Sequence, residues 1–342
     1  MFLHLPMVIL KRTQILAESQ FPVDKYKKLI KPLRKGYYCK ENRTVPGDAP
    51  KDFIRVYEYG EKVRRRNPKT WPAYIAKVGH KYYPMESVTE YLLNEIGEVL
   101  GFNMAKSKLM QVDSQVRFLS LFFLETEEEI LDHGAQIFAG YLGDENFANE
   151  IEVMGMAQKL YTFQFAEQAI ISRFENEAGD LLKEFVKMLL FDAIVGNNDR
   201  HFYNWGVITH LRNKKKPIFA PIYDTARGLF WNETEDQLQE KFFAHPKEID
   251  RRLESYAKGS HPKTGWEGFS KTINHFDLLE KIYDNDSRYK DICHSCLNDG
   301  KLNAVFKMID RKFIKLMSSH RIELIKRCLD IRVQMLKGAV KL

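Results

Sequence analysis

The pattern of apolar and polar positions changes along the chain near residue 125. Before that point, short runs rich in aromatic and β-branched residues predict strands at 53–59, 71–78 and 116–124. The run at 116–124 is largely apolar, which is typical of a central strand buried on both faces. The first part of the chain is therefore expected to form a small unit rich in β-structure.

A single helix is expected within this first part. Apolar residues recur there at helical spacing, at Val88, Leu92, Ile96 and Val99. Gly101 follows at the place of a C-cap glycine. The pattern predicts a helix over 87–100, between the second and third strands.

After the acidic stretch 125–129 the pattern becomes mostly helical. Apolar stripes predict helices at 181–195 and over much of 269–342. Two strand-like runs, 205–210 and 217–222, flank a basic turn and predict a hairpin. The expected fold class is α+β, with a small β-rich lobe that contains one helix and a larger, mostly α-helical lobe.

The boundaries of these parts follow from the same changes. We expect an N-terminal extension at 1–51, the first lobe at 52–130 and the second lobe at 131–342. The extension is basic and ends in a turn-rich stretch. Residues 1–10 are apolar with no positive region before them, which favours a strand or a buried arm over a signal peptide.

Composition narrows the class of protein. With 342 residues, 44% hydrophobic and 29% charged, the chain has the usage of a folded soluble protein. No apolar stretch reaches the roughly 20 residues of a membrane span. Four scattered cysteines do not form a disulfide framework and favour the cytoplasm, while export as an effector stays open. The net charge of +7 is spread over the chain, so nucleic acid is not favoured as a partner over a nucleotide or an acidic protein.

Three residues have the spacing that phosphoryl transfer requires. Protein kinases use an Asp near the attacking hydroxyl, an Asn five residues later on Mg²⁺, and a second metal-binding Asp further on. Asp199 and Asn204 have this spacing, and Asp224 follows the second strand of the predicted hairpin. Carboxylate and amide oxygens suit Mg²⁺. The alternative is that all three form ordinary turns or caps.

The segment Gly196-Asn-Asn-Asp-Arg-His-Phe-Tyr-Asn204, with Pro221-Ile-Tyr-Asp224, resembles the catalytic and metal-binding signatures of HipA-like serine/threonine kinases. A more distant similarity is to phosphoinositide kinases. The resemblance extends from about residue 52 to the C-terminus. It implies a bilobal protein-kinase-like fold, ATP and Mg²⁺ as cofactors, Asp199 as catalytic base, and His201 as a brace of the loop.

The first lobe supplies candidates for holding the nucleotide. Lys77, in Ala73-Tyr-Ile-Ala-Lys77-Val78, is similar to the strand lysine of kinases, and Glu90 is its expected partner. Ser87 and Glu90 also match a helix capping box, in which Glu90 would bond the backbone instead. Gly60 is the candidate for a loop that covers the phosphates, with a solvated turn as the alternative.

Two further features stay open on sequence alone. Arg200 is either a phosphate contact or a surface charge. The Gly/Pro-punctuated segment from Ser260 to Trp266 is either a loop that faces the substrate or a plain surface connection.

The leading hypothesis is a HipA-like kinase that phosphorylates Ser or Thr of a protein substrate. The alternatives are a lipid or small-molecule kinase of the same fold and a pseudokinase that serves as an interaction module. Toxin-type relatives carry a further N-terminal domain and work beside an antitoxin, whereas about 50 residues precede the kinase-like part here. We therefore expect a stand-alone, toxin-like kinase domain and carry over no antitoxin partner.

Overall fold

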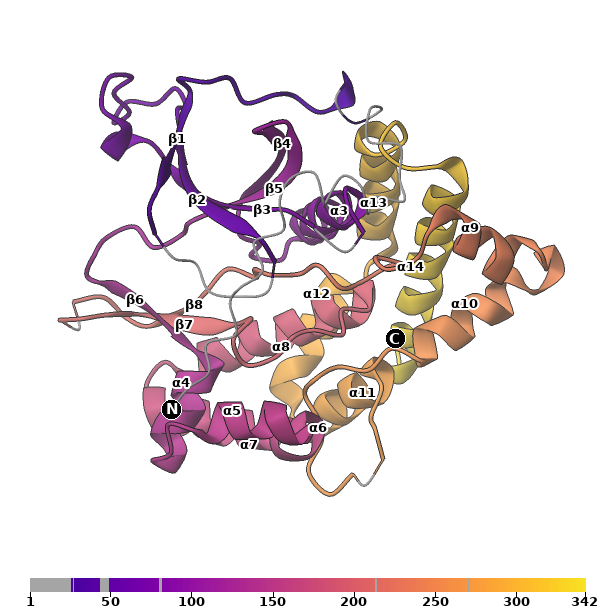
Figure 1. Cartoon of the computed structure of the whole chain (residues 1–342). Coiled ribbons are helices and arrows are strands. Elements are labelled where there is room, and N and C mark those ends of the chain that lie inside the picture. The colour runs from indigo at the N-terminus through magenta and orange to yellow at the C-terminus, as the bar shows by residue number, and fades with distance from the viewer. Residues whose placement is uncertain (1–25, 27, 44–48, 80–81, 213, 270) are drawn as a thin grey trace. The chain divides into compact units, whose positions relative to one another are not determined.

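The computed structural model describes residue 26 and residues 28–43, 49–79, 82–212, 214–269 and 271–342 (Figure 1). The strand or arm expected at 1–10 lies outside these ranges. The chain divides into two compact units, which are described separately. The first contains the described residues up to Tyr91 together with Lys106–Phe122, and the second contains Leu92–Ala105 and Phe123–Leu342.

The first unit is built on a five-stranded antiparallel sheet in the order β1-β2-β3-β5-β4. Its strands are β1 (Tyr38–Glu41), β2 (Lys51–Val56), β3 (Ala73–Lys77), β4 (Ser107–Val112) and β5 (Gln115–Leu121), with a short 3-10 turn, η1, at Pro68–Thr70. The structure confirms the predicted strands as β2, β3 and β5. Strand β1 lies within the segment expected to be an extension, and β4 was not predicted.

The buried face of this sheet follows from the alternation of its side chains. Ile54 of β2, Ala76 of β3 and Leu119 of β5 have no exposed surface, and they form one apolar cluster. Burial of such side chains stabilises the unit by roughly 1.5–3 kcal/mol for each large residue. This cluster holds β3, and with it Lys77, in a fixed register against β2 and β5.

Helix α3 (Met85–Leu100) confirms the predicted helix and begins two residues earlier than expected. Residues 85–91 belong to the first unit and 92–100 to the second. Its apolar stripe is buried, since Val88, Leu92 and Ile96 have no exposed surface. Gly101 ends the helix with a φ of +89°, in the left-handed region that glycine adopts without strain.

The second unit contains a small antiparallel sheet of β6 (Glu129–His133), β7 (Gly206–His210) and β8 (Ile218–Phe219). Strands β7 and β8 confirm the predicted hairpin with shorter strands. Strand β6 was not predicted, and it contains residue 130, where we expected the first lobe to end. The predicted domain limits themselves stay a prediction.

The rest of the second unit is helical (Figure 1). Its longer helices are α4 (Gly134–Leu142), α5 (Phe147–Met154), α7 (Phe163–Phe174), α8 (Ala178–Val195), α10 (Ile249–Lys258), α11 (His275–Asn285), α13 (Asp299–Lys312) and α14 (Ser319–Ala339). Short turns of helix are α6 (Ala157–Leu160), α9 (Glu235–Leu238), η2 (Gln239–Phe243), η3 (Pro246–Glu248), η4 (Ser287–Tyr289) and α12 (Lys290–Cys296). Among the residues that the structure describes, no helix has both the length and the apolar character needed to cross a bilayer.

Candidate active site

The segment that carries Asp199 begins at the end of the most buried helix of the second unit. Thirteen of the eighteen residues of α8 are buried, so this helix is a rigid support. It ends at Gly196, whose φ of +68° lies in the left-handed region. A Cβ at Gly196 would lie 3.0 Å from a guanidinium nitrogen of Arg332, so a larger residue would also be crowded there. The chain therefore leaves the helix at a fixed point.

Asp199 is held by contacts at both its side chain and its backbone. Its two carboxylate oxygens contact Arg227: Oδ1 accepts a hydrogen bond from Nη1 at 3.2 Å, and Oδ2 lies 3.1 Å from Nε in an ion pair. Its backbone oxygen accepts from the side-chain amide of Asn204 at 2.8 Å. Burial raises the pKa of Asp199, and the cation of Arg227 opposes that rise. The carboxylate is thus oriented by a cation that the sequence had not identified.

Arg227 comes from the segment that follows Asp224. Its backbone oxygen accepts from the amide of Asn198 at 3.2 Å, beside Asp199. At Gly228 a Cβ would lie 2.6 Å from the backbone oxygen of Val195, so glycine permits this close approach. An arginine three residues after the candidate metal-binding Asp224, followed by a glycine, is the sequence signal that could have found it.

The candidate magnesium ligands Asn204 and Asp224 are linked through one arginine. Nη1 of Arg200 donates to the backbone oxygen of Asn204 at 2.7 Å and to that of Tyr223, directly before Asp224, at 2.6 Å. Asp224 itself has a φ of +53°, which is uncommon for a residue other than glycine. The structure therefore brings the segments of Asp199, Asn204 and Asp224 together. Their roles as ligands and base stay predictions.

Arg200 is an internal brace, so both sequence interpretations of it were wrong. Its side chain is 1% exposed and forms a two-point ion pair with Asp192, at 2.8 and 2.9 Å. A further bond runs from Nη2 to Oγ1 of Thr225 at 2.7 Å. With the two backbone bonds to Asn204 and Tyr223, all five N–H groups of this guanidinium are used. No N–H group of Arg200 remains to bind a phosphate, and its charge does not lie on the surface.

His201 has the geometry of the predicted brace. Its ring Nδ1 accepts from the backbone amide of Tyr203 at 3.2 Å. Its backbone amide donates to Asp199 at 2.8 Å, and its backbone oxygen accepts from Asn204 at 2.9 Å. These bonds close the turn between the two predicted functional residues.

In the first unit, Lys77 and Glu90 form the expected ion pair. The ammonium nitrogen lies 2.7 Å from Oε1, and the two residues are 8% and 5% exposed. The capping-box alternative is not adopted, because the helix begins at Met85 and Ser87 lies inside it. The hydroxyl oxygen of Ser87 instead accepts from the amide of Gly79 at 3.0 Å. Nucleotide binding by this pair stays a prediction.

Gly60 lies in the connection between β2 and β3. Its backbone oxygen accepts from the amide of Val63 at 3.0 Å, and the glycine is exposed. This is the geometry of the solvated turn that we gave as the alternative. A phosphate contact by Gly60 stays a prediction.

The donor set in the second unit suits Mg²⁺ more than a transition metal. Among the described residues, no group of three or more His, Cys, Asp or Glu side chains is arranged to hold a metal ion. Asn204 and Asp224 offer one amide and one carboxylate instead. Mg²⁺ is commonly held by one or two such groups, with phosphate oxygens and water completing its coordination. The residues present therefore fit the metal that the resemblance implies.

The segment from Ser260 to Trp266 lies beside the candidate loop. The hydroxyl of Ser260 donates to Oδ1 of Asn198 at 2.7 Å, and the backbone of Gly265 pairs with that of Tyr161 and Phe163. Because Asn198 directly precedes Asp199, the start of this segment lies close to the candidate loop within the second unit. Both interpretations of the segment, as a loop that faces the substrate or as a connection, remain open.

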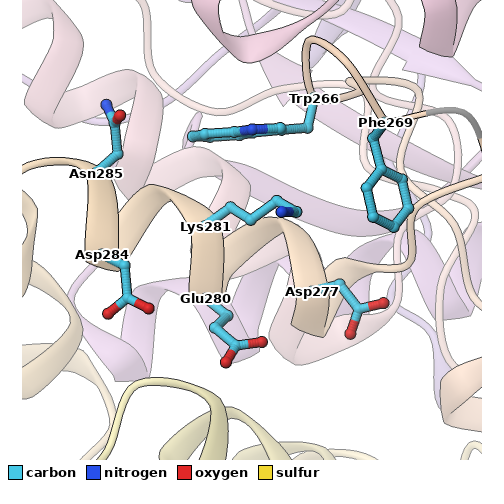
Figure 2. Close-up of a pocket in the computed structure, with 7 residues that line it drawn as sticks. All are labelled: Trp266, Phe269, Asp277, Glu280, Lys281, Asp284 and Asn285. Atoms are coloured by element: carbon cyan, nitrogen blue, oxygen red, sulfur yellow. The ribbon is translucent and has the colours of Figure 1, made fainter.

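A pocket of about 570 Å³ adjoins the end of this segment (Figure 2). Trp266 and Phe269 line it together with residues of α11, and Lys281 lies 5.8 and 5.2 Å from the two ring centres. Two of its three acidic residues have partners of their own: Asp277 accepts from Asn274 at 3.0 Å, and Asp284 pairs with Lys341 at 2.8 Å. Groups of the chain itself thus already neutralise or bind these two carboxylates.

Comparison with known proteins gives matches along most of the chain. The model of the HipA-like C-terminal domain matches residues 44–282. The serine/threonine-protein kinase CtkA of Helicobacter pylori (strain J99) is 24% identical over 198 residues, which is 58% of this chain. The match covers 56% of that protein, so this chain aligns with about half the length of the curated relative.

Solved structures agree in fold. The crystal structure of a Helicobacter pylori proinflammatory kinase, CtkA, superposes with a TM-score of 0.67 at 19% identity, and the match covers 89% of this chain and 96% of that one. HipA of Shewanella oneidensis MR-1, solved with HipB and operator DNA, gives a TM-score of 0.49 at 11% identity, and the match covers 93% of this chain and 71% of that one. The match to CtkA confirms the predicted α+β, protein-kinase-like fold.

Proposed function

Because the chain belongs to the family with a HipA-like C-terminal domain, we propose that it is an ATP- and Mg²⁺-dependent kinase that phosphorylates serine or threonine of a protein. The observation that carries this proposal is the arrangement around Arg200, which ties the segments of Asn204 and Asp224 to the loop of Asp199. The related CtkA is named a serine/threonine-protein kinase, which supports serine or threonine of a protein as the acceptor.

In the proposed reaction, the acceptor hydroxyl oxygen forms a bond to the γ-phosphorus while the bond from that phosphorus to the β,γ-bridging oxygen breaks. The hydroxyl proton passes to the carboxylate of Asp199. Asn204 and Asp224 would hold Mg²⁺, which would neutralise charge on the phosphates. His201 keeps the turn between Asp199 and Asn204 closed through its bond from Tyr203.

The first unit would contribute the cation that holds the nucleotide. Lys77 is kept extended by its 2.7 Å contact with Glu90, so its ammonium group does not have to be ordered when phosphate arrives. Kinases use a strand lysine and a helix glutamate in this way. The proposal includes a cytoplasmic location and a protein acceptor, and it includes neither an antitoxin nor a nucleic acid partner.

The test is transfer of label from [γ-³²P]ATP with Mg²⁺ to proteins of a cell lysate, for wild type, Asp199→Asn and Asp224→Ala. Asp250→Asn is the matched control, since its side chain is 66% exposed and pairs with Arg327 on the surface. We expect labelled serine or threonine from the wild type and the control, and a loss of at least about 100-fold in the other two. ATP binding is measured in parallel.

Equal labelling by all four proteins would refute the assignment of Asp199 and Asp224. Label found in lipid or in a small molecule would replace the protein acceptor by the first alternative. Binding of Mg²⁺-ATP by the wild type with no transfer would favour the pseudokinase.

A further inference from the structure

Arg227 is the cation that touches the predicted base, and none of the sequence predictions included it. It makes a two-point contact: Nη1 donates a hydrogen bond to Oδ1 of Asp199 at 3.2 Å, and Nε lies 3.1 Å from Oδ2 as an ion-pair contact. A two-point contact between guanidinium and carboxylate fixes the plane of the carboxylate as well as its position. A single bond, or a lysine, would fix position alone.

The backbone that carries Arg227 is anchored independently of Asp199. The amide of Asn198 donates to the oxygen of Arg227, and the amide of Leu229 donates to that of Val195, each at 3.2 Å. Gly228 between them lies against the backbone of Val195, where a Cβ would meet its oxygen at 2.6 Å. The guanidinium also lies 5.4 Å from the ring centre of Trp231. Arg227 is thus presented by a fixed segment and a fixed side chain.

A base in this position needs such a support. The final torsion of an aspartate side chain is broad, so an unsupported carboxylate has no single orientation. A general base is effective when one oxygen lies within hydrogen-bond reach of the proton it takes. The side chain of Asp199 is 20% exposed, so one face is open to a reacting group while Arg227 controls its rotation.

We propose that Arg227 is a positioning residue, which aims the carboxylate of Asp199 at the acceptor hydroxyl through its two-point contact, one hydrogen bond and one ion-pair contact. This inference rests on the proposed function, since it gives Arg227 a task in the same reaction. It concerns orientation and includes no additional chemical step. Arg227 is therefore expected to affect kcat and not the affinity for ATP.

The test compares Arg227→Ala and Arg227→Lys with wild type, using [γ-³²P]ATP and myelin basic protein as the probe acceptor. For Arg227→Ala we expect kcat to fall about 10- to 100-fold with KM for ATP nearly unchanged. Guanidinium ion at non-denaturing concentration should restore part of that kcat. The kcat of Arg227→Lys should lie between those of wild type and Arg227→Ala, because lysine keeps the positive charge but cannot make the two-point contact of a guanidinium group.

Arg327→Ala is the matched control, because this arginine pairs with Asp250 and Glu323 on the surface. It should keep wild-type kcat and give no response to guanidinium. An unchanged or higher kcat in Arg227→Ala would overturn the proposal, as would a rise in KM alone or a loss of kcat that guanidinium does not restore.

A second measurement needs no activity, so it separates this inference from the proposed function. Crystal structures of wild type and Arg227→Ala should show one orientation of the Asp199 carboxylate in the first, and a rotated or divided one in the second. An identical orientation in both would refute the positioning role even if the wild type transferred no phosphate. Inactive wild type with a reoriented Asp199 would refute the proposed function alone.

Discussion

Two arginine–aspartate pairs at the candidate loop have the same chemistry and opposite environments. Arg200 and Asp192 are both about 1% exposed, and the guanidinium has no unused N–H group. Arg227 and Asp199 keep 36% and 20% of their side-chain surface exposed. The first pair is closed to any ligand, whereas the second leaves a carboxylate that a substrate can approach.

The contrast teaches how neighbouring residues of one motif divide their tasks. Asp199 and Arg200 are adjacent in the chain, yet Arg200 bonds inward to α8 and to the two segments that bear Asn204 and Asp224. A buried ion pair is held by many bonds because an unsatisfied buried charge is costly. A half-exposed pair can exchange partners at a smaller cost. We therefore infer that the buried Arg200 holds the loop structure together, whereas the partly exposed Arg227 orients the carboxylate of Asp199.

The largest effect on stability is expected from Arg200→Met. The substitution leaves Asp192 buried without its cation, which should lower the free energy of unfolding by about 3–5 kcal/mol. Arg227→Ala should lower it by less than about 1 kcal/mol, because that pair is partly exposed. Urea denaturation followed by circular dichroism measures both values.

The double variant Arg200→Met with Asp192→Leu sharpens this comparison. If the unpaired charge causes the loss, removal of both charges should recover part of it. No recovery would mean that the bonds from Arg200 to Asn204, Tyr223 and Thr225 carry most of the stabilisation. Equal losses for Arg200→Met and Arg227→Ala would break the comparison.

A smaller, mainly functional effect is expected from Lys77→Met. Lys77 and Glu90 are nearly as buried as Arg200 and Asp192, but we assign them to the nucleotide. We expect kcat/KM for ATP to fall about 100-fold, as when one charged donor is removed from a transition state. Steady-state kinetics with ATP checks the value.

Lys40→Met is the control in the same unit, since Lys40 pairs with Asp52 and Asp113 at 42% exposure. It should leave kcat/KM for ATP close to that of wild type. Wild-type kinetics in folded Lys77→Met would remove the nucleotide role and leave Lys77 and Glu90 as a structural pair.

The smallest effect is expected from Arg327→Ala on the surface of α14. Its bonds to Asp250 and Glu323 are largely solvated, so the free energy of unfolding should fall by about 0.5 kcal/mol or less. High salt should remove even this difference, because it screens exposed charges. A loss above about 2 kcal/mol in urea denaturation would mean that exposure does not separate these pairs in the way we infer.

The sequence predicted the elements whose pattern is long or strongly apolar. The central strands β2, β3 and β5, helices α3 and α8, and the hairpin of β7 and β8 were expected near their observed positions. The missed strands β1, β4 and β6 are short or half-exposed, with burial that does not follow a clean alternation. These strands form because they hydrogen-bond to neighbouring strands, and the sequence of one segment does not show which other segment it will pair with.

The same limit applied to the candidate site. Asp199, Asn204 and Asp224 were found because their spacing is a property of the local sequence. The choice of Glu90 between Lys77 and a helix cap depended on where α3 begins and on the approach of β3 to it. Sequence left that choice open, and the fold decided it.

By itself, then, the sequence determined the fold class, the order of the main elements and the identity of the residues with kinase-like spacing. The tertiary structure alone decided that Arg200 points inward and that Arg227, 28 residues after Asp199, binds it. The physical reason is that spacing is encoded along the chain, whereas the partner of a charge is set by burial and by distance between segments that meet after folding.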